Sequence, residues 1–311
     1  KRDKPFFAVA SFINPHDICF AYNARQPNRK GKPLVDRLYR EAQALPADQL
    51  PPLPDNSAVP KREPEAIEAN MKEISVTPAK LIRKDYNNRD WRNYRWIYCR
   101  LTERVDAQIG RLLDALKVHD LEKNTLVIFT SDHGDMDGSH RLASKNVFYE
   151  NSVGVPFMMQ YKGVIPAGVV DNNSLVSNGL DVLPTLCDYA GVSIPNYLLG
   201  RTLRPVAEGR GDNARRPYVV AENNTGRMLR SDRYKYCVYT SGKIRESLVD
   251  LQADPGEMKN LAGLPEFQKE LNLHRGYLKK WIAESKDGAA EPFAIEPACS
   301  AHAVRNIRHA Q

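Results

Sequence analysis

The sequence lacks the features that would place it in a membrane or mark it for export. No apolar run approaches the roughly 18 residues that a membrane-spanning helix needs, so we expect no membrane span. The chain opens on the charged residues KRDK, without the apolar core of a signal peptide. We therefore expect a processed or partial chain, in which no export signal remains to be read.

Clustered cysteines and clustered basic residues are missing as well. None of the five cysteines lies in a C-x-x-C pair, so neither a zinc site nor a disulfide framework is predicted. The net charge of +7 fits an acidic substrate, but the basic residues are spread out without interleaved aromatic residues. We therefore predict no nucleic-acid partner. The cysteines are Cys19, Cys99, Cys187, Cys237 and Cys299.

Apolar runs and one long periodic segment predict an α/β fold. With 42% hydrophobic residues among 311, the chain can bury a large core. Residues 5–12, 125–130 and 156–161 have strand character, and 125–130 suits a strand buried on both faces of a parallel sheet. Apolar residues at three- and four-residue steps predict a helix over 91–119. A second helix is expected over 182–190, with Asp181 as N-cap and Gly191 as its stop.

The pattern of predicted secondary structure changes after about residue 205. Short strand-like runs at 218–222, 228–230 and 234–239 precede an amphipathic helix over 265–284. This order predicts a compact α+β subdomain. We therefore expect a larger α/β domain over 1–205 and a C-terminal subdomain over 206–311. Residues 23–79 carry nine prolines among many charged residues, which favours a long irregular excursion beside a binding site.

Polar residues that could bind a metal or an anion follow the strand predicted over 125–130. Asp132 and His133 come directly after it, and Gly134 permits a sharp turn. Ligands collect outside the carboxyl ends of strands in open α/β sheets. His140 and Lys145 follow within a few residues, so a carboxylate, imidazoles and an ammonium predict an anion or metal site. The alternative is an ordinary loop of solvated polar residues.

Four segments, in this order, resemble a known family. They are FFAVASFINPH at 6–16, residues 125–145, SNGLDVLPTLCDYAGV at 177–192 with its D-x-x-P-T motif, and YKY at 234–236 with LVDLQADPGEMKNL at 248–261. Together they resemble the C-terminal two-thirds of a type I sulfatase in the alkaline-phosphatase-like superfamily. The resemblance implies a central sheet flanked by helices, followed by the smaller α+β subdomain.

Two parts of the family pattern are absent from these 311 residues. The family's nucleophile is a formylglycine made from Cys or Ser in a C/S-x-P/A-x-R motif, and neither that motif nor an Asp-Asp pair for the first metal ligands occurs here. The resemblance therefore implies that a segment before these residues carries both. That segment is expected either as a separate chain or as a part of a longer one, or else the chain is a truncated, inactive product.

The resemblance also implies roles for five residues. Asp132 would supply a carboxylate oxygen to one calcium ion, and His133 would occupy the adjacent ligand position. Imidazole is a less natural calcium ligand than oxygen, so a hydrogen-bonded loop residue is the alternative for His133. Lys145 would stabilise charge and assist proton transfer to the leaving oxygen. His16 would contact sulfate or protonate the leaving group, and His140 would support the site.

The substrate is only weakly encoded. Many relatives have Lys at the position of Asn14, so a second lysine contact to sulfate is in doubt. Arg25 and Arg227 are candidate substrate contacts, and the turn at 222–224 is better read as an ordinary polar turn than as a sugar contact. The substrate-binding residues thus stay unknown.

Three functions remain open from the sequence. The first is a hydrolase of sulfate esters on a sulfated carbohydrate, such as a glycosaminoglycan fragment, in the periplasm or secreted. The second is a phosphodiesterase or phosphonate hydrolase with two transition metals and a Thr nucleophile. The third is a non-catalytic remnant that binds polyanions.

Overall fold

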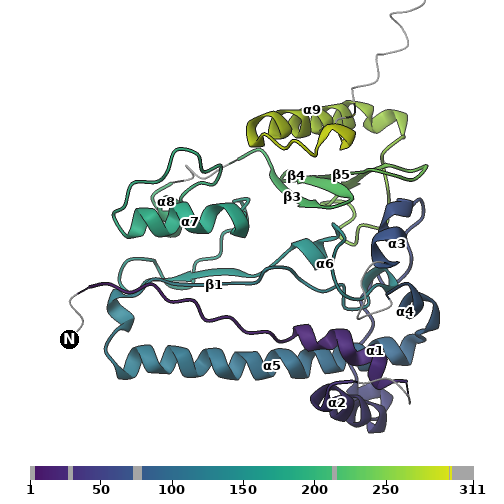
Figure 1. Cartoon of the computed structure of the whole chain (residues 1–311), viewed down its shortest axis with the longest axis horizontal. Helices are drawn as coiled ribbons and strands as arrows, with labels where there is room; N and C mark the ends of the chain where they lie inside the picture. The colour runs from purple at the N-terminus through teal and green to yellow at the C-terminus, as the bar shows by residue number, and fades with distance from the viewer. Residues whose placement is uncertain (1–3, 27–30, 73–78, 212–215, 294, 296–311) are drawn as a thin grey trace, which may run out of the picture. The chain divides into compact units, whose positions relative to one another are not determined.

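The computed structural model describes residues 4–26, 31–72, 79–211, 216–293 and 295 (Figure 1). The chain divides into two compact units. Unit 1 comprises residues 1–57, 72–125 and 135–144, and unit 2 comprises residues 58–71, 126–134 and 145–311. No helix in the described ranges is both long enough and apolar enough to cross a lipid bilayer. The domain boundary near residue 205 falls inside unit 2 and stays a prediction.

Unit 1 is helical and is built around α5, Asn88–Val118. The predicted helix over 91–119 is thereby confirmed, and its start is fixed by a capping box between Asn87 and Asp90. Ile97 and Leu101 are fully buried, whereas the apolar positions nearer the carboxyl end are partly exposed. The other described helices of this unit are η1 (His16–Phe20), α1 (Ala21–Ala24), α2 (Pro33–Ala44), η2 (Ala47–Gln49), α4 (Ala79–Asp85), η3 (Glu122–Asn124) and η4 (Ser139–Arg141).

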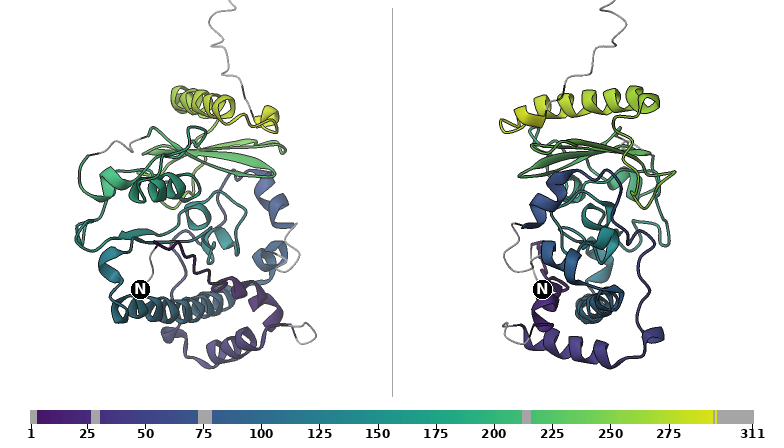
Figure 2. Two further views of the ribbon diagram at one scale, coloured as in Figure 1. Left: turned by 60° about the vertical axis from the view of Figure 1, so that its left-hand side comes forward. Right: turned by 90° about the vertical axis from the view of Figure 1, so that its right-hand side faces the viewer.

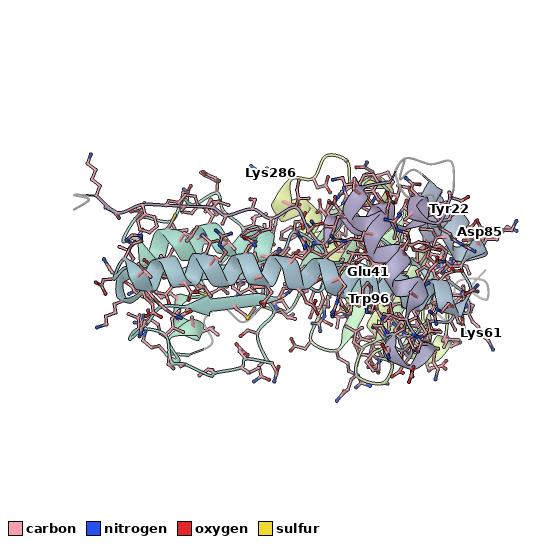
Figure 3. The ribbon with its side chains drawn as sticks, turned by 90° about the horizontal axis from the view of Figure 1, so that it is seen from below. Tyr22, Glu41, Lys61, Asp85, Trp96 and Lys286 are labelled. Carbon is pink, nitrogen blue, oxygen red and sulfur yellow. The ribbon has the colours of Figure 1, made fainter. Side chains whose placement is uncertain are left out.

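Helix α2 corrects the prediction of an irregular excursion over 23–79. Pro33 stands at its first turn, where a missing N–H costs nothing, and Val35 and Leu38 are buried in the core that α5 shares. Figure 3 labels Glu41 of this helix. The same figure labels Tyr22 and Asp85, whose hydroxyl and carboxylate are 2.9 Å apart. The prolines of this region therefore begin helices rather than only breaking them. Residues 27–30 and 73–78 lie outside the described residues.

The strand predicted over 5–12 is wrong. These residues form no helix or strand, and their apolar side chains are exposed, with Phe7 75% and Val9 72% exposed. Strand character in a sequence becomes a strand only when a neighbouring strand satisfies its backbone groups. Within the described residues, no such neighbour pairs with this segment.

The first two strands of unit 2 are short. β1 (Val127–Thr130) pairs antiparallel with β2 (Phe157–Gln160), with Thr130 opposite Phe157. The two strands are confirmed, but the parallel sheet buried on both faces is wrong: β1 is partly exposed along its length. A run of apolar residues indicates a strand, but it does not indicate the direction of its partner.

The C-terminal part of unit 2 is a four-stranded antiparallel sheet covered by α9, Gln268–Ser285 (Figures 1 and 2). The strands are β3 (Val219–Asn223), β4 (Gly226–Arg230), β5 (Tyr234–Tyr239) and β6 (Glu246–Asp250), in sequential order. The predicted α+β subdomain is thereby confirmed, although β6 was not predicted as a strand. Leu229, Tyr236 and Leu248 face the helix residues Leu271 and Leu278 in one core. The remaining elements of unit 2 are α3 (Glu65–Lys72), α6 (Glu150–Val153), α7 (Asn178–Tyr189), α8 (Arg204–Ala207), η5 (Pro265–Phe267) and η6 (Glu291–Phe293).

The D-x-x-P-T motif ties α7 to the chain that follows it. The helix starts before the predicted range, and Asp181 is not its N-cap: its carboxylate accepts from the N–H of Ser177 at 2.8 Å and of Arg201 at 2.9 Å. Thr185 donates its hydroxyl to the Asp181 carbonyl at 2.6 Å and accepts from Leu203 N at 2.9 Å. Because both side chains are fully buried, the motif acts as a structural link.

His274 fixes α9 to the sheet. The imidazole is 1% exposed, with Nδ1 2.9 Å from the Glu270 carbonyl and Nε2 2.9 Å from the Ser231 hydroxyl in the turn after β4. The rings of Tyr234 and Tyr277 pack edge-on against it. Burial lowers the pKa of His274 below its ordinary value of 6.5. The folded protein therefore holds a neutral imidazole that links helix and sheet.

This burial predicts a pH dependence of stability. The unfolded His274 takes up a proton near pH 6.5 and the folded one does so only at lower pH, so its contribution is present above pH 6.5 and is lost as the pH falls toward the folded pKa. We expect His274→Gln to flatten the free energy of unfolding between pH 7.5 and 5.5, and to lower it at pH 7.5 by about 1–3 kcal/mol. Urea unfolding at several pH values measures both effects. His119→Gln, at an exposed position, is the control; equal slopes for the wild type and His274→Gln would contradict the prediction.

Candidate functional site

The polar loop after β1 holds Asp132 and His133 in unit 2. Asp132 is 84% exposed at its side chain, and its carboxylate accepts from His133 N at 3.0 Å and from the Ser131 hydroxyl at 3.3 Å. Burial opposes ionisation of Asp132, but His133 and the backbone N–H groups keep its pKa below the ordinary value. Asp132 is therefore an ionised, accessible carboxylate.

The orientation of His133 follows from its own loop. Its Nδ1 lies 2.8 Å from the Gly134 carbonyl, so Nδ1 carries the proton and Nε2 is left as the lone-pair donor. Nε2 lies 3.4 Å from the Asp132 carboxylate. The carboxylate and the imidazole thus point toward the same place, as adjacent metal ligands would.

Two neighbours hold this loop in position. Asn178, at the start of α7, donates its amide to the Ser131 carbonyl at 2.6 Å. Gly134 donates its N–H to Ser152 O at 2.8 Å, and a Cβ at Gly134 would lie 2.0 Å from Asn151 O. Only glycine permits this close approach. The sequence suggested the glycine as a turn, but it offered no signal for the part played by Asn178.

Lys145 belongs to the same unit and is partly exposed. Among the described residues, no carboxylate forms an ion pair with its ammonium group. Ser144 and Asn146 on either side have φ of 70° and 77°, in the left-handed region that costs non-glycine residues about 1–2 kcal/mol. Lys145 thus presents an ammonium group that no described carboxylate neutralises, on a backbone flanked by two residues with positive φ.

A buried ion-pair network lies a few residues beyond Lys145. The Lys235 ammonium is 2.7 Å from the carboxylates of both Glu257 and Glu150, and 2.8 Å from the Phe148 carbonyl. Burial raises the pKa of Glu257, whereas burial at Glu150 is outweighed by the attraction of Lys235, so that its pKa is lowered. The network fixes the chain after Lys145 to β5.

His16 and His140 lie in unit 1. His16 is exposed at the start of η1, with Nδ1 4.0 Å from the Cys19 sulfur. His140 is fully buried with φ of 55°; its carbonyl accepts from Arg83 at 2.9 Å and its Nε2 lies 3.4 Å from the Asn56 amide. This burial fits the supporting role predicted for His140 better than direct contact with a substrate. The convergence of His16 with Lys145 stays a prediction.

Asp135 anchors the loop that carries His140. Its carboxylate accepts from the Tyr94 hydroxyl at 3.1 Å, from Asp137 N at 2.8 Å and from Ser144 N at 3.1 Å. Burial raises the pKa of Asp135 to about 7. Asp137 in turn pairs with Arg95 at 2.9 Å. The loop is thus held by its own acidic residues, which are not available as metal ligands.

The described residues fit a divalent cation in part. Asp132 offers a hard oxygen ligand and His133 an imidazole nitrogen, but no three His, Cys, Asp or Glu side chains come together as a metal site in the ranges that the structure describes. Calcium takes six to eight oxygen ligands, so these two side chains would supply only part of its shell. The oxygen of Asp132 suits calcium better than the nitrogen of His133 does.

The two arginines guessed as substrate contacts have structural partners. Arg25 lies 3.3 Å from the Asp90 carboxylate. Arg227 is 6% exposed, pairs with Asp287 at 2.8 Å and stacks on the ring of Phe293. Their interactions hold the fold together within their own units.

Several known proteins with similar sequences are sulfatases. The family model for sulfatases matches residues 1–192, and the model for the C-terminal part of N-sulphoglucosamine sulphohydrolase matches residues 138–283. A delta 4,5-hexuronate-2-O-sulfatase of Bacteroides thetaiotaomicron is 32% identical over 310 residues, which cover 96% of this chain and 61% of that protein. Human arylsulfatase K is 34% identical over 201 residues, which cover 60% of this chain and 37% of that protein.

Solved structures agree with the sequence matches. A 2-O GAG sulfatase aligns with a TM-score of 0.74 at 32% identity, covering 88% of this chain and 58% of that one. A phosphonate monoester hydrolase of Agrobacterium radiobacter aligns with a TM-score of 0.66 at 25% identity, covering 92% of this chain and 58% of that one. The mixed α/β fold expected from the resemblance is thereby confirmed.

The chain spans less than two thirds of the length of these relatives. Each match lies within a single longer chain, which gives the alternative of a separate partner chain no support. Since the sulfatase model matches residues 1–192, more than half of the 311 residues, the chain belongs to the sulfatase family of the alkaline-phosphatase-like superfamily.

Proposed function

We propose that the protein removes sulfate from a sulfated carbohydrate, and that its substrate is a uronic-acid-containing glycosaminoglycan fragment. The observation that carries the proposal is the conformationally constrained Lys145, whose ammonium pairs with no carboxylate of the described residues, in the same unit as the ionised Asp132. The likeness to a hexuronate-2-O-sulfatase over 96% of the chain supports the choice of substrate class. A periplasmic or secreted location is proposed with it, since such glycans lie outside the cytoplasm.

Lys145 would act on the ester itself. A sulfate monoester carries negative charge on its non-bridging oxygens, and more charge develops on the bridging oxygen as the S–O bond breaks. An ammonium group neutralises that charge and can donate a proton to the departing alkoxide. His16 is proposed as a second donor to the sulfate or to the leaving oxygen, and His140 as support for the loop.

Asp132 and His133 would hold a divalent cation, proposed to be calcium, with further ligands from outside the described residues. The bound cation would supply Lewis-acid polarisation of a sulfate oxygen. Asp132 contributes the harder donor, and the proton on Nδ1 of His133 leaves Nε2 free to face the ion. The formylglycine nucleophile would come from a segment that these 311 residues do not contain.

Hydrolysis of a phosphonate monoester is the second candidate, because a hydrolase of that class shares the fold with a TM-score of 0.66. The two substrates carry the same single negative charge and differ in the central atom, sulfur or phosphorus, while the fold is shared. Turnover of a 2-O-sulfated unsaturated uronic acid disaccharide against a phosphonate monoester, in the full-length protein, decides between them. Faster turnover of the phosphonate would overturn the sulfatase proposal.

Removal of the Lys145 ammonium should abolish most activity in the full-length protein. We expect Lys145→Ala to lower turnover of the sulfated disaccharide by about a hundredfold or more, the usual scale for a positioned charge or proton donor. Folding should persist, since the side chain makes no ion pair with a described residue. Lys269→Ala removes an exposed lysine of α9 and serves as the control. Full turnover by Lys145→Ala would refute the assigned role.

Loss of Asp132 should instead affect cation binding. We expect the wild-type melting temperature to rise with calcium, because a cation that binds only the folded state stabilises it by mass action. Asp132→Ala should lose most of that rise while keeping its melting temperature in chelator. Asp232→Ala, at an exposed turn position, should keep the rise. A calcium-induced shift of wild-type size in Asp132→Ala would show that Asp132 holds no cation.

A further inference from the structure

The main chain next to Lys145 is held by two side-chain amides of unit 2. The carbonyl of Asn146 lies 3.2 Å from Asn223 Nδ2 and 3.4 Å from Asn70 Nδ2. Asn223 ends β3, and Asn70 lies in α3 with 7% exposure. Two donors from distant parts of the sequence thus meet at one carbonyl oxygen, directly after Lys145.

Thr225 determines which way both amides point. Its hydroxyl lies 2.6 Å from Asn70 Oδ1 and 3.2 Å from Asn223 Oδ1, and its N–H donates to Asn223 Oδ1 at 3.0 Å. The N–H of Thr225 can only donate, so it directs the Asn223 oxygen to itself and the NH₂ group toward Asn146, while the single hydroxyl hydrogen is donated to the nearer oxygen, that of Asn70. The β3–β4 hairpin therefore supplies one oriented donor, Asn223, and through Thr225 orients the second, Asn70 of α3.

A second contact fixes the same segment two residues further on, at Phe148. A Cβ at Gly226 would lie 2.7 Å from the ring of Phe148 and 3.0 Å from the ring of Tyr239, so only glycine lets the hairpin approach this closely. The rings of Phe148 and Tyr239 lie 6.0 Å apart. The chain from Asn146 to Phe148 is thus attached at two points to the first turn of the C-terminal sheet.

These contacts bear directly on Lys145. Its long side chain has many rotamers and forms no ion pair with a described residue, so the place of its ammonium group depends on where its main chain is held. Asn146 has φ of 77°, a left-handed conformation that asparagine accepts more readily than most residues, and the two amide hydrogen bonds hold its carbonyl in place. Without these two hydrogen bonds the backbone at Asn146 can change conformation, and the ammonium group of Lys145 would move with it.

We propose that Asn223, Asn70 and Thr225 are positioning residues that hold Lys145 at the sulfate ester. The inference rests on the proposed function for the role of Lys145, but the anchor itself stands on the hydrogen bonds above. It assigns the β3–β4 hairpin a part in the reaction, and it gives Asn223 a structural target in place of a sugar hydroxyl.

The test replaces one amide donor with an isosteric acceptor. Asn223→Asp keeps the oxygen that Thr225 contacts and puts a carboxylate oxygen opposite the Asn146 carbonyl. Asn224→Asp adds the same charge one residue away, at an exposed turn position with no hydrogen bond to a described residue, and is the matched control. In the full-length protein we expect kcat of Asn223→Asp to fall about tenfold or more, with KM changed less, because a displaced group loses its effect at the transition state. Asn224→Asp should keep both constants.

A double variant separates positioning from general damage. In the Lys145→Ala background, Asn223→Asp should lower turnover no further, since the group that it positions is gone. Hydrogen exchange of the amides of residues 145–149 provides a readout without substrate: protection should fall in Asn223→Asp and not in Asn224→Asp. Unchanged exchange, or a further tenfold loss of turnover in the double variant, would overturn the proposal. A wild-type protein that turns over no sulfate ester would refute the proposed function, while the exchange data would still decide the anchor.

Discussion

The buried ammonium of Lys235 is the interaction on which much of unit 2 depends. It is 2% exposed and contacts two carboxylates and one carbonyl, from α6, from the loop before it and from the chain after β6. Removing one partner of such a buried pair usually costs 3–5 kcal/mol, because the other charge is left without compensation. The network therefore holds these three pieces of chain together around Lys235. The segment after Lys145 is one of them.

The loop before Lys145 contains several residues with unfavourable backbone conformations, and hydrogen bonds hold that loop in place. Asp137, His140, Arg141 and Ser144 all have positive φ, as does Asn146. The cost is about 1–2 kcal/mol for Arg141 and Ser144 and smaller for the Asp, His and Asn residues, which tolerate this conformation, so the loop would relax if nothing held it. Asp135 holds its beginning and end through Asp137 N and Ser144 N, and the amides at the Asn146 carbonyl hold the chain beyond. Stored strain with many restraints is typical of functional loops, and here it lies on both sides of Lys145.

The parts of the fold that the sequence predicted are those with a clear period. The helices around Ile97 and Leu271 and the strand at Tyr236 repeat apolar residues at helical or alternating spacing, so local pattern and tertiary burial agree. The segment around Phe7 failed because a strand needs a partner, which periodicity does not reveal. Helix α2 was not predicted because the nine prolines of residues 23–79 indicated irregular structure and outweighed the helical spacing of Val35 and Leu38.

The residues of the candidate site also differ in whether the sequence predicted them. Asp132 and Lys145 could be picked out because polar residues after a strand, in a family's order, carry information along the chain itself. Asn70 and Asn223 could not, because they reach the Asn146 carbonyl across 76 and 77 residues of sequence, and a polar turn that binds a main chain looks the same as one that faces water. The residues proposed for the chemistry are encoded locally, whereas the residues that hold their backbone are encoded only in the folded contacts. In unit 2 those contacts come from α3 and from the C-terminal sheet, so the sheet does more than cover apolar surface: it restrains the backbone on which the proposed role of the Lys145 ammonium depends.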